Sequence, residues 1–255
     1  MKGRDLLIYL AIKYNGTWND IYAAISRREI VNPQDVIEEN AQLTCQTLTI
    51  LDENYPESFK SVHHPPFVLF YYGDINLLSD YKKNVAVIGS REHSEYGKRM
   101  TEKIVKEISG KVNIVSGLAR GIDAISHQEC LANNGHTIAI LGSGIDYCYP
   151  KNNQNLYEEI KKNHLLISEY PKRCEPKKEN FPERNRLIAA CSSAVVVTEA
   201  KAKSGTIITV GHMLDLGREV LCVPHRADEA SQCNRLIAGG ATLVENGEDV
   251  LFAIQ

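Results

Sequence analysis

The segment Val112-Asn-Ile-Val-Ser-Gly-Leu-Ala-Arg-Gly-Ile-Asp123 leads from an apolar run through a glycine-rich loop into a predicted helix. Residues 112–115 have the composition of a buried strand, and residues 123–133 have the apolar spacing of a helix. Two glycines bracket Arg120 in the loop between them. A strand that enters a helix through such a loop is typical of an open α/β sheet that binds anions.

The same alternation of strand and helix runs from residue 84 toward the end of the chain. Apolar strands are predicted at residues 85–88, 112–115, 137–141, 165–168, 194–197 and 220–223. Helices are predicted near 96–109, 123–133, 154–162, 184–191 and 205–216, with a last helix and strand within 231–244. Nearly continuous apolar strands joined by crossover helices indicate an α/β fold with a doubly wound, mostly parallel sheet.

Two shorter regions precede this sheet. Residues 1–46 have helix-period apolar positions and form a predicted small helical domain, in which Asn32 is a candidate cap. Residues 47–83 contain two extended runs, so we interpret them as a connecting segment and the edge of the main domain at 84–255. His63 and His64 precede prolines and have no nearby ligand partners, which favours a solvated loop over a metal site.

Composition restricts the class of protein. The 255 residues carry a formal net charge of -3, so any nucleic-acid binding must come from a local basic patch. The seven cysteines form no C-x-x-C pair, which favours a reducing cytoplasm over a disulfide framework or a zinc ribbon. No apolar run reaches the roughly 20 residues that a membrane helix needs, so we expect no membrane insertion.

Three other strand ends carry small or cationic residues. Gly89-Ser-Arg91 follows the first predicted strand, Gly142-Ser-Gly144 follows the third, and Ser204-Gly-Thr206 opens a later helix. Each can hold an anion through backbone N–H groups, hydroxyls or the planar Arg91 fork. For the first two loops, an ordinary turn explains the residues equally well.

A fourth segment combines charge with an aromatic ring. Residues 172–186 contain six cations against three glutamates, and Phe181 lies among them. Cations on phosphates and a ring on a base are the means by which single strands are bound. The alternative is that Phe181-Pro182 anchors a helix start while the lysines remain solvated.

Catalytic layouts are missing from the sequence. No P-loop, H-E-x-x-H, G-x-S-x-G or Cys/His cluster is present, so we expect neither an enzyme nor a cofactor nor a metal. Glu199 could be catalytic, but a structural role as acceptor for Arg184 or Arg186 is favoured.

Several of these motifs together resemble one known family. The motifs are Val87-Ile-Gly-Ser-Arg91, Val115-Ser-Gly-Leu-Ala-Arg-Gly-Ile-Asp123, Ile138-Ala-Ile-Leu-Gly-Ser-Gly-Ile-Asp146, Ser168-Glu-Tyr-Pro171 and Phe181-Pro-Glu-Arg-Asn-Arg186. In order and spacing they are similar to the DNA-processing protein A family, also called DprA or Smf, over residues 48–250. The resemblance implies an extended Rossmann-like domain that binds single-stranded DNA, protects incoming strands in natural transformation and helps to load the RecA recombinase. It also implies a homodimer.

The resemblance also implies a set of site residues. The expected DNA contacts are Gly89, Ser90, Arg91, Ser116, Gly117, Leu118, Ala119, Arg120, Gly121, Lys178, Phe181, Arg184, Asn185 and Arg186. Further phosphate or anion contacts are expected at Gly142, Ser143, Ser204, Gly205 and Thr206.

The sequence departs from the family pattern in places. Val223-Pro-His225 stands where Val-Pro-Gly is usual, and Ser231-Gln-Cys-Asn234 lacks a usual glycine, which puts that rim of the pocket in doubt. Many members continue into a winged-helix domain, whereas this sequence ends at Gln255.

A second hypothesis is a nucleotide phosphoribohydrolase or nucleotide sensor, because Glu199 and Ser204-Gly-Thr206 are also similar to that related superfamily.

Overall fold

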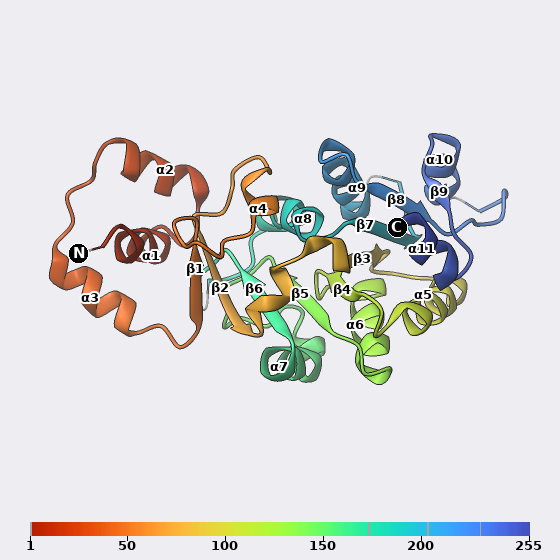
Figure 1. Ribbon diagram of the computed structural model, residues 1–255, viewed down its shortest axis with the longest axis horizontal. Coiled ribbons are helices and arrows are strands. Elements are labelled where there is room, and N and C mark those ends of the chain that lie inside the picture. The colour runs from red at the N-terminus through yellow and green to blue at the C-terminus, as the bar shows by residue number, and fades with distance from the viewer. Residues whose placement is uncertain (1, 173, 203, 230) are drawn as a thin grey trace.

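The computed structural model describes residues 2–172, 174–202, 204–229 and 231–255. Within these ranges, nine strands form one sheet in the order β1-β2-β6-β5-β4-β3-β7-β8-β9 (Figure 1). The strands are β1 (Gln46–Thr49), β2 (Val68–Gly73), β3 (Asn84–Gly89), β4 (Asn113–Ser116), β5 (Thr137–Leu141), β6 (Leu165–Ser168), β7 (Ala194–Glu199), β8 (Glu219–Cys222) and β9 (Thr242–Leu243). From β6 to β9 all neighbours are parallel, whereas β1 and β2 pair antiparallel to each other and β2 pairs antiparallel to β6. The predicted α/β, mostly parallel sheet is confirmed.

Helices cover both faces of the sheet. The helices are α1 (Gly3–Lys13), α2 (Trp18–Ser26), α3 (Pro33–Ala41), α4 (Glu57–Lys60), α5 (Glu95–Ile108), α6 (Ile122–Ala132), α7 (Gln154–Asn163), α8 (Asn180–Cys191), α9 (Gly205–Asp215), α10 (Cys233–Ala238) and α11 (Gly247–Ala253). In Figure 1, α8 and α9 lie above the sheet and α6 and α7 lie below it. Short 3-10 turns are η1 (Ile75–Leu78), η2 (Tyr81–Lys83) and η3 (Lys151–Asn153).

The strand β3 shows how the sequence produces these two layers. Its side chains alternate between faces, as in any strand. Val85 and Val87 pack with residues of α5 in one core cluster. Ala86 and Ile88 pack with residues of α8 and α9 in another cluster. A strand buried on both faces therefore reads as a continuous apolar run, which is the pattern of the sequence.

The strand order reverses direction at β3. The chain steps from β3 to β4, β5 and β6 on one side, then crosses back so that β7 pairs with the other side of β3. The loops after β3 and β7 consequently diverge to opposite faces of the sheet. In open α/β sheets, ligands bind in the crevice at such a switch point, beyond the carboxyl ends of the strands.

The amino-terminal helices lie beyond β1, at the end of the molecule opposite to the carboxyl terminus (Figure 1). Leu10 and Ala11 of α1 share a core cluster with Phe70 of β2 and Leu141 of β5. Residues 47–83 contribute two strands to the sheet, so this segment extends the main domain at one edge. The division at residues 46 and 83 itself stays a prediction.

Two local differences from the sequence expectations matter. Helix α8 begins at Asn180, so Phe181 and Pro182 occupy its first turn instead of preceding it, because proline is compatible with the start of a helix. The short helix α11 was not predicted; the side chain of Asn246 caps it by accepting a hydrogen bond from the backbone N–H of Asp249. In the described part of the chain, no helix is long and apolar enough to span a bilayer.

Candidate functional site

A cleft of about 740 Å³ opens at the carboxyl ends of β3, β4 and β7, where the strand order reverses. The loops after these strands form its walls together with the first turns of α8 and α9. Its lining residues are Ile88, Gly89, Ser90, Arg91, Glu92, Ala119, Arg120, Asp123, Tyr149, Lys178, Phe181, Pro182, Arg184, Asn185, Ile188, Lys201, Ser204, Gly205, Thr206, Ile208 and Thr209.

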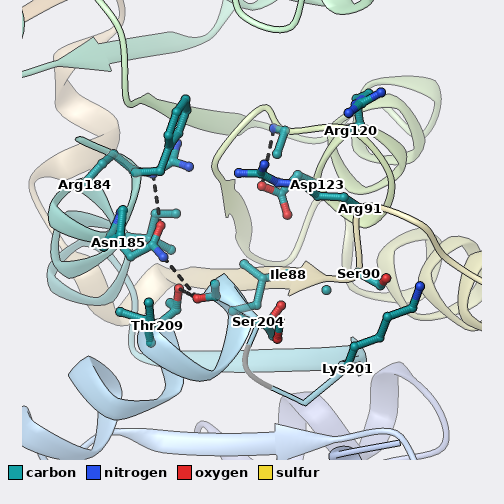
Figure 2. A pocket seen from close by; sticks show the side chains of 18 of the residues that line it. Ile88, Ser90, Arg91, Arg120, Asp123, Arg184, Asn185, Lys201, Ser204 and Thr209 are labelled. Carbon is teal, nitrogen blue, oxygen red and sulfur yellow. Dashed lines mark hydrogen bonds between the residues drawn. The ribbon is translucent and has the colours of Figure 1, made fainter. Parts of the chain in front are cut away.

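Four exposed cations stand on the rim of the cleft. Arg91 follows β3, Arg120 follows β4, Lys178 precedes α8 and Lys201 follows β7. Figure 2 shows Arg91, Arg120 and Lys201 along one side of the pocket, opposite Asn185, Ser204 and Thr209. Among the described residues, only Lys201 of these four makes an ion pair, at 3.1 Å from the exposed Glu92. The rim is therefore a cationic surface that is largely open to an anionic ligand.

The loop after β4 is held in shape by Asp123. Its Oδ2 accepts hydrogen bonds from the backbone N–H groups of Gly117 at 3.2 Å and Ala119 at 3.4 Å. Gly121 has a φ of 79°, and a Cβ there would lie 2.3 Å from the carbonyl oxygen of Ser90. Glycine thus lets the loops that carry Arg91 and Arg120 meet. Burial raises the pKa of Asp123.

Arg184 forms part of the cleft floor and is 4% exposed. Its Nη1 donates to the carbonyl oxygens of Gly117, at 2.8 Å, and of Ile140. A Cβ on Gly117 would lie 2.6 Å from Nη2 of Arg184, so the absence of a side chain makes room for the guanidinium. Burial lowers the pKa of Arg184 to about 10, with the Asp123 carboxylate acting in the opposite direction. Arg184 therefore joins β4, β5 and α8.

Arg186 does not line the cleft and is 2% exposed. Its two terminal nitrogens donate to the two carboxylate oxygens of Glu169, each at 2.7 Å. The guanidinium also donates to the carbonyl oxygens of His63 and His64. Burial opposes its ionisation, but Glu169 outweighs that effect and raises the pKa of Arg186. The expected place of Arg186 beside the pocket is corrected: its donors are all directed into the fold.

Two aromatic rings border the cleft. Phe181, in the first turn of α8, is partly buried, and the guanidinium carbon of Arg91 lies 5.5 Å from its ring centroid. The ring of Tyr149 is 42% exposed and lies 5.6 Å from Phe181, centroid to centroid, at a tilt of 41°. Both rings also line a small adjoining pocket with Gly117 and Gly142.

The start of α9 forms the wall opposite Arg91. Ser204, Gly205 and Thr206 all line the cleft, and Asn185 of α8 donates from Nδ2 to the carbonyl oxygen of Gly205 at 3.1 Å. Ser204 occupies the N-cap position, but its hydroxyl makes no capping hydrogen bond. Helix N-termini favour anions because their first N–H groups have no partner within the helix.

Glu199 makes a different contact from the one expected. Its Oε2 accepts hydrogen bonds from the backbone N–H of Ser94 at 2.9 Å and from the Ser94 hydroxyl at 2.6 Å. The expectation that it accepts from Arg184 or Arg186 was wrong, because Arg186 pairs with Glu169 and Arg184 binds backbone carbonyls. Glu199 is structural at the start of α5, where the Ser94 hydroxyl also caps the helix.

The structure brings most of the expected site residues together. Those that line the cleft are Gly89, Ser90, Arg91, Ala119, Arg120, Lys178, Phe181, Arg184, Asn185, Ser204, Gly205 and Thr206. Gly117 and Gly142 line the adjoining pocket. Ser116, Leu118, Gly121, Ser143 and Arg186 line neither. Ser116 and Ser143 are buried and donate to the carbonyl oxygens of Val87 and Tyr147.

The basic stretch at residues 172–186 is not one exposed patch. Arg184 and Arg186 are buried, and Lys172 pairs with Glu39 of α3 at 2.9 Å. Arg173 lies outside the described residues. The positive rim instead combines Lys178 with cations from three other loops, which the charge count along one segment did not anticipate.

Sequence reasoning missed Lys201 and Tyr149. Lys201 follows the predicted strand at 194–197, so its place at the carboxyl edge could have been inferred from the topology. Tyr149 lies beyond the predicted strand at 137–141, and no local pattern distinguishes it from other surface tyrosines.

The departures from the family pattern lie off the cleft. The backbone N–H of His225 donates to Oδ1 of Asn234 at 2.9 Å, and Nδ2 of Asn234 donates back to the His225 carbonyl oxygen at 2.8 Å. The turn is closed despite the lost glycines, and neither residue lines the cleft. In the part of the chain that the structure describes, the seven cysteines are free thiols and no group of three or more His, Cys, Asp or Glu residues could hold a metal.

Comparisons with known proteins show which family this chain is similar to. A family model described as DNA recombination-mediator protein A matches residues 46–255. The DNA processing protein DprA of Streptococcus pneumoniae is 42% identical over 207 residues, which are 80% of this chain and 73% of that protein. The X-ray structure of DNA processing protein A from the same species has a TM-score of 0.81 at 36% identity and covers 98% of this chain and 93% of that one. A structure of DNA processing protein A from Helicobacter pylori, reported for its single-stranded DNA binding mode, has a TM-score of 0.74 at 32% identity. The match covers 83% of this chain and 96% of that one.

Proposed function

Because this chain belongs to the DNA recombination-mediator protein A family, we propose that it binds single-stranded DNA in the cleft, without sequence preference. One observation supports the proposal most. Cations from four separate loops, Arg91, Arg120, Lys178 and Lys201, converge on one rim beside two aromatic rings. Cations on phosphates and rings on unpaired bases are the usual means of binding single strands.

Rim cations beside an exposed ring favour a single strand over a duplex. The formal net charge of -3 gives no general attraction to DNA, so affinity depends on contacts within the cleft. Neutralising three or four phosphates of a single strand releases counterions, which gives a slope of roughly -2 to -3 in log K against log salt concentration. An exposed aromatic ring in the cleft can stack only on a base that has left the helical stack.

The test is fluorescence anisotropy with a labelled oligothymidine and with a duplex of the same length, over a series of salt concentrations. We expect tighter binding of the single strand and a negative salt slope. Equal affinity for the duplex, or no binding of oligothymidine at low salt, would reject the proposal.

Further proposals concern partners and setting. The protein protects incoming strands and helps to load RecA in natural transformation, acting as a homodimer in the cytoplasm. These proposals are supported by membership of a family described as DNA recombination-mediator protein A. RecA filament growth on single strands coated with single-strand-binding protein, with and without this protein, tests the loading role. Light scattering of the purified protein tests the dimer.

The proposed role is not catalytic. The hydrolase hypothesis assigns the catalytic carboxylate to Glu199, which does not line the cleft, is 8% exposed and accepts two hydrogen bonds from Ser94. Incubation with nucleoside monophosphates should release no free base. Release that disappears in Glu199→Gln would establish the competing hydrolase function.

A further inference from the structure

The two rings at the cleft differ in how much of their surface is free. Tyr149 is 42% exposed and lines both the cleft and the adjoining pocket. In the described part of the chain, its hydroxyl makes no hydrogen bond with another residue. The ring is therefore presented to whatever enters the cleft, and its polar tip is available to water or ligand.

Phe181 is covered by protein on several sides. The guanidinium of Arg91 lies over its ring, 5.5 Å from the centroid. A Cβ built on Gly142 would lie 2.8 Å from Cδ1 and 3.1 Å from Cε1 of Phe181, so the ring rests against this backbone. Tyr149 itself covers a further part. Phe181 is therefore less open to a base than Tyr149.

The contact between Phe181 and Arg91 suggests another role for the phenyl ring. A guanidinium within about 6 Å of a ring centroid is attracted by the ring quadrupole. Such a contact restricts a side chain that is otherwise free at an exposed rim position. Arg91 is exposed and has no carboxylate partner among the described residues. The Phe181 ring is therefore the contact that can restrict the direction of its guanidinium.

We propose that Tyr149 is the ring on which an unpaired base stacks, while Phe181 is a positioning residue that orients Arg91 toward a phosphate. The inference rests on the proposed single-strand binding. It divides the recognition of one nucleotide between two neighbouring rings: one acts on the base and the other on the sugar-phosphate chain through a guanidinium.

The division can be tested with two ligands of equal length and charge: labelled oligothymidine and the same backbone built from abasic tetrahydrofuran units. Loss of one stacked base weakens binding by about tenfold. We expect Tyr149→Ala to lose about tenfold in affinity for oligothymidine and little for the abasic strand. Tyr149→Phe should restore oligothymidine binding, because it keeps the ring. Phe181→Ala should weaken binding of both strands by the same factor.

Controls separate the possible outcomes. Phe252→Ala removes a more exposed ring, 79% exposed on α11, and should change neither affinity. Circular dichroism spectra verify that the variants fold. Equal losses on both ligands in Tyr149→Ala, or no loss on oligothymidine, would overturn the role of Tyr149 while leaving single-strand binding intact. If the wild-type protein binds neither ligand, the proposed function fails and the inference fails with it.

Discussion

Arg184 in the floor of the cleft and Arg186 beneath it are 4% and 2% exposed, whereas Arg91 and Arg120 stand on the rim and are exposed to solvent. The buried pair is bound by protein acceptors: carbonyl oxygens for Arg184, and the Glu169 carboxylate for Arg186. The rim pair makes no ion pair among the described residues. Taking a charge out of water is so costly that a buried arginine must have its donors satisfied by the fold itself.

The buried arginines and the rim arginines therefore have different roles. The arginines of Phe181-Pro-Glu-Arg-Asn-Arg186 connect α8 to β4, β5 and the His63 loop, and so fix where the rim stands. Binding of an anion is left to side chains that are still hydrated. We expect changes beneath the cleft to alter stability, and changes on the rim to alter affinity.

The largest expected effect comes from breaking the buried ion pair. Arg186→Met leaves the Glu169 carboxylate buried without its partner, which we expect to lower the free energy of unfolding by about 3–5 kcal/mol. Urea denaturation followed by circular dichroism measures it. Arg226→Met removes an arginine from an exposed pair with Asp228 and should change stability little. Similar stability of both variants would show that the buried ion pair contributes no more to stability than the exposed one.

A buried histidine gives a pH-dependent effect of nearly the same size. His127 is fully buried; its Nδ1 lies 2.6 Å from the Thr137 hydroxyl and its Nε2 has no partner among the described residues. Burial lowers the pKa of His127 from 6.5 to about 3, with Arg184 adding to the effect. The unfolded chain then binds more protons than the folded one below pH 6.5. Stability is fully present above that pH and is lost as the pH falls toward 3.

Down to about pH 4, this residue alone should remove about 3 kcal/mol from the free energy of unfolding. Urea denaturation between neutral pH and pH 4 should therefore show a smaller loss in His127→Gln than in the wild-type protein. His136→Gln changes an exposed ring and should keep the wild-type profile. Parallel curves for the wild type and His127→Gln would show that folding does not lower the pKa of His127.

Filling the space beside Arg184 should have an intermediate effect. In Gly117→Ala, the new methyl group would meet the guanidinium at 2.6–2.7 Å, and we expect a loss of about 1–3 kcal/mol in thermal or chemical denaturation. Gly211→Ala, in α9, would meet nothing within 4 Å and should stabilise the protein by about 0.5–1 kcal/mol through helix propensity. Stabilisation by both substitutions would indicate that Arg184 moves away from the new methyl group without cost.

The smallest expected effect is on DNA binding by the rim cations. Arg91→Ala should weaken single-strand binding by about 1 kcal/mol for all sequences alike and reduce the salt slope by about one, while leaving stability nearly unchanged. Lys178→Ala should behave in the same way. Lys111→Ala removes an exposed lysine in the turn before β4, at the opposite edge of the sheet, and should leave both quantities unchanged. An unaltered slope in Arg91→Ala and Lys178→Ala would remove both from the DNA contact surface.

Much of the fold could be predicted because its pattern is local. Apolar runs such as residues 85–88 are buried on both faces, and helix-period spacing marks the covering helices. The Asn32 cap was also expected, and the structure confirms it: the Asn32 side chain accepts a hydrogen bond from the backbone N–H of Gln34 at the start of α3. The short α11 escaped because seven residues show too little periodicity to be identified.

The sequence by itself determined the order of strands and helices, and hence that the loops carrying Arg91 and Arg120 share one edge of the sheet. Only the tertiary structure decided which arginines are free. Arg184 and Arg186 stand two positions apart in one cationic motif with exposed Lys178 nearby, but the acceptors of Arg186 come from Glu169 and from His64, 17 and 122 positions away. Whether a charge is buried depends on such distant partners, because the free energy of desolvation must be offset in three dimensions. The place of Tyr149 in the cleft also depends on distant segments, because Tyr149 meets Phe181 only where the loops beyond β5 and β6 pack together.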